Sequence, residues 1–78
     1  MLAQLQEIFR KVFEDNSLVI TNHTSAKDIN MWDSLTHLEL IASVEEYFNI
    51  KFSFTEVMQF NTVADMLSTI MKKRNNDV

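Results

Sequence analysis

Three residue types are missing from this 78-residue sequence, which contains no cysteine, no glycine and no proline. Without cysteine the chain can form no disulfide, and it offers no thiolate as a nucleophile or as a soft metal ligand. Without glycine the sequence excludes the glycine-rich phosphate loop and the dinucleotide-binding fingerprint. Because glycine and proline are the usual turn residues, the ends of elements must be predicted from helix caps and hydrophobic periodicity instead.

Long apolar runs are also missing. No run approaches the roughly 20 residues that a membrane-spanning helix requires, so we expect no membrane span. The N-terminal segment has neither the basic nor the apolar region of a secretory signal, and we therefore expect a cytoplasmic protein. Two histidines without any cysteine argue against a zinc site, and we expect no metal site in this chain.

The formal net charge of -4 is unevenly distributed along the chain. Between residues 28 and 65 there is one base, Lys51, and the acids are Asp28, Asp33, Glu39, Glu45, Glu46, Glu56 and Asp65. This acidic segment repels nucleic-acid phosphates and favours partners that present basic surfaces. Nucleic acid is therefore not an expected partner.

Hydrophobic residues make up 46% of the chain and recur with helical spacing. The periodicity predicts helices over residues 2–14, 34–49, 55–60 and 62–73. Two serine or threonine residues followed three positions later by an acid fit capping motifs at the last two helices: Ser53 with Glu56, and Thr62 with Asp65. We predict an all-α fold, a small bundle of three longer helices and one short helix in a single domain over residues 1–78.

A long polar connection separates the first two predicted helices. It consists of turn-forming and capping residues apart from Leu18, Val19 and Ile20, which we expect to anchor it on the core. Connections of this length in a compact domain are uncommon and often functional.

The helix over residues 34–49 has two apolar sectors. Its core face is expected to hold Leu40, Ile41, Val44 and Phe48. Leu35 and Ala42 fall on a separate narrow sector beside Glu39 and Glu46. An apolar patch edged by carboxylates suits docking to a basic partner. An alternative is that Leu35 packs on the preceding loop. In that case the acidic side chains only keep this side of the helix soluble and bind no partner.

The segment Asp33-Ser34-Leu35 places a serine at the mouth of this helix. The first amides of a helix lack internal partners, and the helix dipole there favours negative charge. A phosphate attached to Ser34 would therefore be stabilised by the helix end. Taken alone, the motif is more typical of a plain helix cap, which either Asp33 or Ser34 could supply.

Further segments follow this motif at consistent spacing: Glu39-Leu40, Glu45-Glu46-Tyr47-Phe48, Ile50-Lys51-Phe52 and Thr62-Val63-Ala64-Asp65. Together with Asp33-Ser34-Leu35, and without gaps between them, they resemble the acyl carrier protein family. The resemblance extends over the whole chain in length and helix order. It implies a four-helix bundle and a carrier that is not itself an enzyme.

The resemblance also implies a cofactor and its site. A phosphopantetheinyl transferase, using coenzyme A and magnesium, is expected to attach 4′-phosphopantetheine to Ser34, between Asp33 and Leu35. The terminal thiol of that arm would carry an acyl group as a thioester for fatty-acid or specialised acyl or polyketide-type biosynthesis. An external thiol agrees with the absence of cysteine from the chain.

The resemblance further implies that partner enzymes recognise the helix over residues 34–49. Expected partners are an acyl-carrier synthetase, a ketosynthase or an acyltransferase with a basic docking surface, acting on a monomeric carrier. The predicted docking residues are Leu35, Glu39, Ala42, Glu46 and Phe52.

The sequence also departs from the family pattern. Met31-Trp32 stands where Leu-Gly is common, Thr36 replaces a frequent acid, Ser53 replaces a common proline, and the chain is less acidic than the carriers of primary fatty-acid synthesis. These departures leave Ser34 intact. They fit a carrier dedicated to one specialised enzyme at least as well as a general fatty-acid carrier.

Three alternatives remain open from the sequence. The first is an aminoacyl or peptidyl carrier of a nonribosomal system, and the second is an unmodified helical interaction domain that uses the Leu35 and Ala42 patch. The third is a serine esterase in which His37, three residues after Ser34, acts as a base. Since the sequence shows no clear orienting third group and no turn typical of an oxyanion hole, we expect His37 to be structural.

Overall fold

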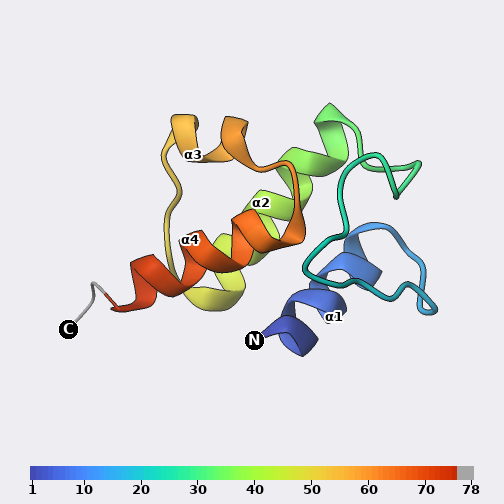
Figure 1. Cartoon of the computed structure of the whole chain (residues 1–78), viewed down its shortest axis with the longest axis horizontal. Helices are drawn as coiled ribbons and strands as arrows, with labels where there is room; N and C mark the ends of the chain where they lie inside the picture. The colour runs from blue at the N-terminus through green and yellow to red at the C-terminus, as the bar shows by residue number, and fades with distance from the viewer. Residues whose placement is uncertain (76–78) are drawn as a thin grey trace.

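The computed structural model describes residues 1–75 and shows a helical bundle (Figure 1). Its elements are α1 (Leu2–Val12), α2 (Ser34–Phe48), α3 (Phe54–Gln59) and α4 (Val63–Asn75). No strand occurs within residues 1–75, where the only strand-like pairing is an isolated bridge between Ser25 and Thr62. The prediction of an all-α fold with three longer helices and one short helix is confirmed.

Two helices end where the backbone turns left-handed. Glu14, at φ 52°, stops the first helix short of the predicted residue 14. Asn49, at φ 55° and ψ 51°, is the C-cap of α2 and sets its end at Phe48 rather than at residue 49. The left-handed region is uncommon for residues other than glycine, although asparagine tolerates it better than most.

The two capping motifs lie where the sequence predicts them. The hydroxyl of Ser53 accepts from the amide of Glu56 at 3.2 Å, so Ser53 is the N-cap and α3 begins at Phe54, one residue earlier than expected. The hydroxyl of Thr62 accepts from the amide of Asp65 at 3.2 Å, and α4 begins at the following residue. α4 continues to Asn75, two residues beyond the predicted end.

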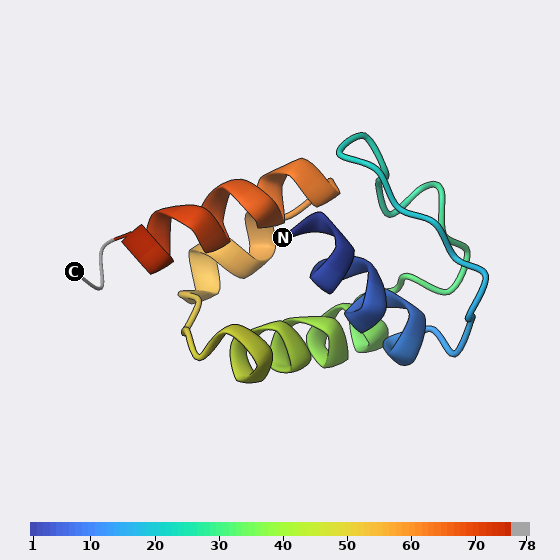
Figure 2. The ribbon, with the colours of Figure 1, turned by 90° about the horizontal axis from the view of Figure 1, so that it is seen from below.

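The core forms where the apolar stripes of α1, α2 and α4 meet. Figure 2 shows α1 lying between α2 and α4. The most deeply buried side chains come from these three helices: Leu5, Phe9, Leu40, Val44, Val63, Met66 and Ile70. On α2 the predicted core face is confirmed, with Phe48 only partly buried. No helix within residues 1–75 is both long enough and apolar enough to cross a bilayer.

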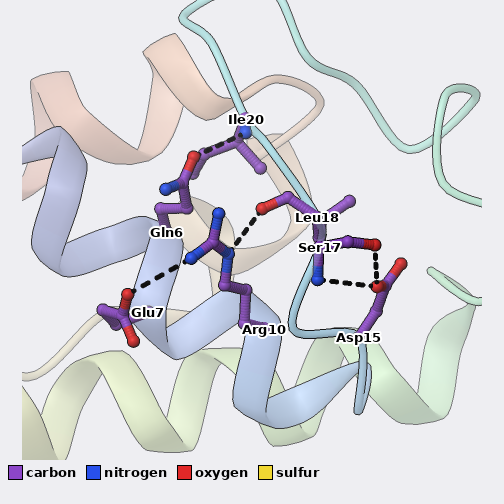
Figure 3. A network of polar contacts seen from close by, with 7 residues as sticks. All are labelled: Gln6, Glu7, Arg10, Asp15, Ser17, Leu18 and Ile20. Carbon is purple, nitrogen blue, oxygen red and sulfur yellow. Dashed lines mark hydrogen bonds and ion pairs between the residues drawn. The ribbon is translucent and has the colours of Figure 1, made fainter.

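The long connection between α1 and α2 is tied to α1 by polar side chains (Figure 3). The side-chain oxygen of Gln6 accepts from the amide of Ile20 at 3.0 Å, and Nε of Arg10 donates to the carbonyl of Leu18 at 2.7 Å. Ile20 is buried and Leu18 is partly buried, as predicted, but Val19 is exposed. In an extended segment adjacent side chains point in opposite directions, so Val19 cannot face the core beside Ile20.

The same connection also provides hydrogen-bond acceptors for the first amides of α4. The amide of Val63 donates to the carbonyl of Thr24 at 2.8 Å, and the amide of Ala64 donates to the carbonyl of Asn22 at 3.1 Å. Two of the first amides of the helix, which lack intrahelical partners, are thereby paired. The connection is therefore bound at both α1 and α4 and holds a defined path.

The core assignment predicts different effects for two leucines of α2. Leu40 is fully buried and Leu38 is 61% exposed. Leu40→Ala should lower the free energy of unfolding by about 2–5 kcal/mol, because it removes buried methyl groups and leaves a cavity. Leu38→Ala should change it by less than about 0.5 kcal/mol. Urea unfolding measures both, and equal losses would contradict the packing described.

Candidate functional site

Trp32, the only tryptophan of the chain, fixes the end of the long connection just before α2. Its indole is buried and packs edge-on against Phe9, with ring centroids 5.3 Å apart and planes at 87°. Phe13 lies on it as well, at 6.2 Å. Edge-to-face aromatic pairs of this kind are favourable beyond the area they bury. The residues that follow Trp32 therefore emerge at one defined place on the surface.

Asp33 is the N-cap of α2. Its Oδ1 accepts from the amide of Thr36 at 3.0 Å, and Oγ1 of Thr36 accepts from the amide of Asp33 at 2.8 Å. The hydroxyl of Thr36 donates in turn to the carbonyl of Met31 at 2.6 Å. Thr36 thus takes the position that Glu or Gln holds in the common capping box. The sequence does not decide whether Asp33 or Ser34 caps the helix. In the structure the cap is Asp33.

Ser34 is the first residue of α2, and its side chain is exposed. Within residues 1–75 its hydroxyl makes no hydrogen bond, since the capping bonds belong to its neighbours Asp33 and Thr36. The interpretation of Ser34 as a plain cap is therefore wrong. The residue that carries this hydroxyl is exposed.

His37 lies on the next turn of α2 with both ring nitrogens engaged. Nε1 of Trp32 donates to Nδ1 of His37 at 2.9 Å, and Nε2 of His37 lies 3.0 Å from the carbonyl oxygen of Val57. An indole N–H only donates and a carbonyl only accepts, so Nδ1 is the acceptor and Nε2 carries the proton. Neither nitrogen is free to accept a proton from Ser34. The arrangement excludes the nucleophile–base pair that an esterase needs.

A groove opens beside Ser34 between α2 and α3, with a volume of about 600 Å³. Ser34 lies among its lining residues, together with Trp32 and His37. Most of the other lining side chains are apolar, and three are large and exposed: Leu38, Phe54 and Met58. The free hydroxyl thus borders an open apolar surface. This groove could not be predicted from the sequence, because its two walls come from separate helices.

The structure brings four of the five predicted docking residues together. Leu35, Glu39, Ala42 and Glu46 are all exposed, and their spacing places them along one side of α2. The alternative in which Leu35 packs on the preceding loop is wrong, because its side chain is 67% exposed. Within residues 1–75 no group of three or more histidine, aspartate or glutamate side chains is placed to hold a metal ion.

The fifth predicted docking residue, Phe52, lies apart from this strip. It is half-buried in the segment between α2 and α3, and its ring packs edge-on to Phe60 at 5.1 Å. Nζ of Lys73 lies 5.9 Å from the ring centroid, within the range of a cation–π contact. Phe52 therefore connects the short helix to α4.

Residues 3–70 match the family described as "Phosphopantetheine attachment site". The solution structure of a holo acyl carrier protein from Geobacter metallireducens is 43% identical to this chain, with a TM-score of 0.90 over 97% of this chain and 87% of the other. The chain belongs to the acyl carrier protein family. A Mycobacterium tuberculosis protein described as an acyl carrier protein shares the fold at 23% identity, with a TM-score of 0.81 over 90% and 93% of the two chains.

This acyl carrier protein is a carrier and not an enzyme, and its cofactor is covalently attached phosphopantetheine. The residues at the start of α2 fit that group. An exposed serine hydroxyl without a hydrogen bond stands at a helix N-terminus, where backbone amides favour a phosphate. The nearest carboxylate, Asp33, has its Oδ1 bound by the amide of Thr36.

The capping geometry predicts a pH-dependent contribution from Asp33. The hydrogen bond from the backbone amide of Thr36 lowers the pKa of this carboxyl below its ordinary value of 3.8. A lowered folded-state pKa means that the stabilisation is present above the ordinary value and is lost as the pH falls through the lowered one. Asp33→Ala should therefore reduce the urea midpoint near pH 7 and have a smaller effect at a pH well below 3.8.

Two variants serve as controls for this prediction. Asp33→Asn should keep most of the stability, because asparagine caps nearly as well as aspartate. Ser34→Ala should leave the midpoint almost unchanged, since its hydroxyl makes no capping bond. A loss in Ser34→Ala as large as that in Asp33→Ala would show that Ser34 is the cap after all.

Proposed function

We propose that this acyl carrier protein holds its phosphopantetheine on the hydroxyl of Ser34. The observation that carries the proposal is the free, exposed hydroxyl at the first position of α2, beside a cap that leaves it unused. A phosphodiester at that position would be stabilised by the helix dipole and by the first amides of the helix. The bound group supplies a terminal thiol that holds an acyl cargo as a thioester.

The proposed attachment is a phosphoryl transfer from coenzyme A to Ser34. The oxygen of Ser34 forms a bond to the phosphorus of coenzyme A that carries the pantetheine, the bond from that phosphorus to the nucleotide breaks, and Ser34 loses its proton. His37 cannot take this proton, because both of its nitrogens are hydrogen-bonded. We expect the base to come from the phosphopantetheinyl transferase, while this chain contributes the positioned hydroxyl.

The strip formed by Leu35, Glu39, Ala42 and Glu46 is the proposed docking face for the transferase and for acyl-transfer enzymes. Two exposed carboxylates alternate with two exposed apolar side chains along one side of α2, starting directly after Ser34. Complementary charge accelerates encounter, and apolar contact adds affinity. Synthetases, ketosynthases and acyltransferases with basic surfaces fit this face, in a fatty-acid or a specialised acyl pathway. A single domain over residues 1–78, a monomeric state and a cytoplasmic location stay predictions.

Enzymatic loading tests the attachment site. Incubation of the unmodified protein with coenzyme A, magnesium and a broad-range phosphopantetheinyl transferase should add one phosphopantetheine mass. Ser34→Ala should abolish the addition, because it removes the accepting oxygen. Ser68→Ala is the matched control, an exposed helical serine on α4, and should load like the wild type. Loading of Ser34→Ala would refute the assignment.

Charge reversal tests the docking face. Glu39→Lys together with Glu46→Lys should lower the kcat/KM of loading by about tenfold at low salt, through loss of electrostatic steering. The difference should shrink as salt rises, because screening weakens the interaction. The single variants Glu39→Lys and Glu14→Lys form a pair with the same change in net charge, and Glu14 is exposed beyond the end of α1. Equal losses in this pair would contradict a localised docking face.

A further inference from the structure

The hydrogen-bond chain from Trp32 through His37 to Val57 joins the three segments that line the groove beside Ser34. We propose that His37 is a positioning residue that holds α3 against α2 and thereby confines an apolar acyl cargo to the outer part of that groove. The part that concerns cargo rests on the proposed attachment at Ser34. The part that concerns His37 can be tested on the unmodified chain.

α3 depends on a few polar contacts for its position. It has six residues, and none of them is fully buried. On one side Nε2 of His37 meets the carbonyl of Val57 at 3.0 Å, the only hydrogen bond between α2 and α3 within residues 1–75. On the other side Nζ of Lys73 lies 2.9 Å from a carboxylate oxygen of Glu56. Apolar packing of Val57 and of the C-cap residue Phe60 also holds α3, and the His37 bond is the polar contact that joins it to α2.

His37 can serve this purpose because it is itself anchored in the core. Its ring lies edge to edge with that of Trp32, with centroids 6.0 Å apart and planes at 21°, and accepts the indole N–H. Trp32 in turn packs on Phe9, which is fully buried. The imidazole thus has a fixed tautomer and a fixed orientation, and its one N–H is directed at α3. A side chain held only by the surface of α2 would not position α3 in this way.

The groove outside this hydrogen-bond chain suits an apolar cargo. Leu38, Phe54 and Met58 line it and are 61%, 79% and 65% exposed. An acyl chain tethered at the rim would remove these surfaces from water, whereas a charged aminoacyl group would gain nothing there. Leu40 and Met66 are fully buried and do not line the groove. With the His37 bond in place, the cargo should contact the groove residues Leu38, Phe54 and Met58. It should not contact the core residues Leu40 and Met66.

Two substitutions divide the functions of His37. In His37→Gln the side-chain amide nitrogen can replace Nε2 and donate to the carbonyl of Val57. In His37→Asn the side-chain oxygen can replace Nδ1 and accept from Trp32, but nothing reaches Val57. The pair therefore separates the bond to α3 from the bond to the indole, because each variant keeps one of the two bonds and loses the other.

Amide hydrogen exchange on the unmodified protein tests the positioning role. Exchange of the α3 amides should accelerate at least about tenfold in His37→Asn and remain near the wild-type rate in His37→Gln. Amides of α1, such as that of Phe9, should not change in either variant. The fluorescence of Trp32 should show the opposite order, with the larger change in His37→Gln. Equal α3 exchange in the two variants would overturn the role of His37.

Methyl NMR of loaded protein tests the confinement of cargo. The probes are acetyl and octanoyl groups, transferred from their coenzyme A derivatives by the transferase. In the wild type the octanoyl group should shift the signals of Leu38 and Met58 relative to acetyl and leave those of Leu40 and Met66 in place. In His37→Asn the signals of Leu40 and Met66 should move as well. Shifts of these core signals in the wild type would overturn the confinement.

The two experiments fail in different ways. A protein that accepts no acyl-phosphopantetheine would refute attachment at Ser34, while hydrogen exchange on the unmodified chain would still decide the role of His37. Conversely, normal loading with equal α3 exchange in His37→Asn and His37→Gln would leave the attachment intact and refute only the present inference.

Discussion

The packing of Trp32 on Phe9 determines where the long connection becomes α2, and the geometry of the site depends on that contact. The connection has no glycine or proline to direct it, so its course is set by side chains that reach the core or the polar side of α1. With the indole buried, Asp33 follows at a fixed point and can cap α2. The indole N–H, which needs an acceptor once buried, finds one in His37.

At the start of α2 that this contact positions, adjacent residues have different functions. Asp33 and Thr36 satisfy the helix end between them, which leaves the hydroxyl of Ser34 without a structural bond. The oxygen that we propose to carry the phosphodiester therefore makes none of the capping bonds of α2. Here the structural and the chemical functions belong to different side chains. Modification at Ser34, as we propose it, would leave the capping bonds of α2 in place.

Much of the fold could be predicted from the sequence because α2 and α4 carry apolar residues at strict helical spacing, and Ser53 and Thr62 supply recognisable caps. The ends at Glu14 and Asn49 could not, since both adopt left-handed backbone where glycine would have been the signal. The prediction that Val19 anchors the connection together with Leu18 and Ile20 is wrong, because Val19 is exposed. In an extended backbone only alternate side chains can face the core.

The site could be predicted in part. Asp33-Ser34-Leu35 predicts Ser34 as the attachment site that we propose. The residue that caps the helix is not predicted, because Asp33 and Ser34 are both suitable cap residues and the outcome depends on the bond that Thr36 makes to Asp33. The hydrogen bonds of His37 join Trp32 to Val57. Hydrophobic periodicity does not predict contacts between residues so far apart in the chain. A buried tryptophan close to a histidine was the one available signal, because its N–H requires a partner.

Peptide mapping by tandem mass spectrometry of the protein purified from its own host tests the central claim most directly. The expected result is phosphopantetheine on the peptide that contains Ser34, located at that residue by the fragment ions, together with an acyl group that identifies the cargo. A native protein that is uniformly unmodified at Ser34, or that bears the group on another residue, would contradict the proposal that this hydroxyl links the carrier to its cargo.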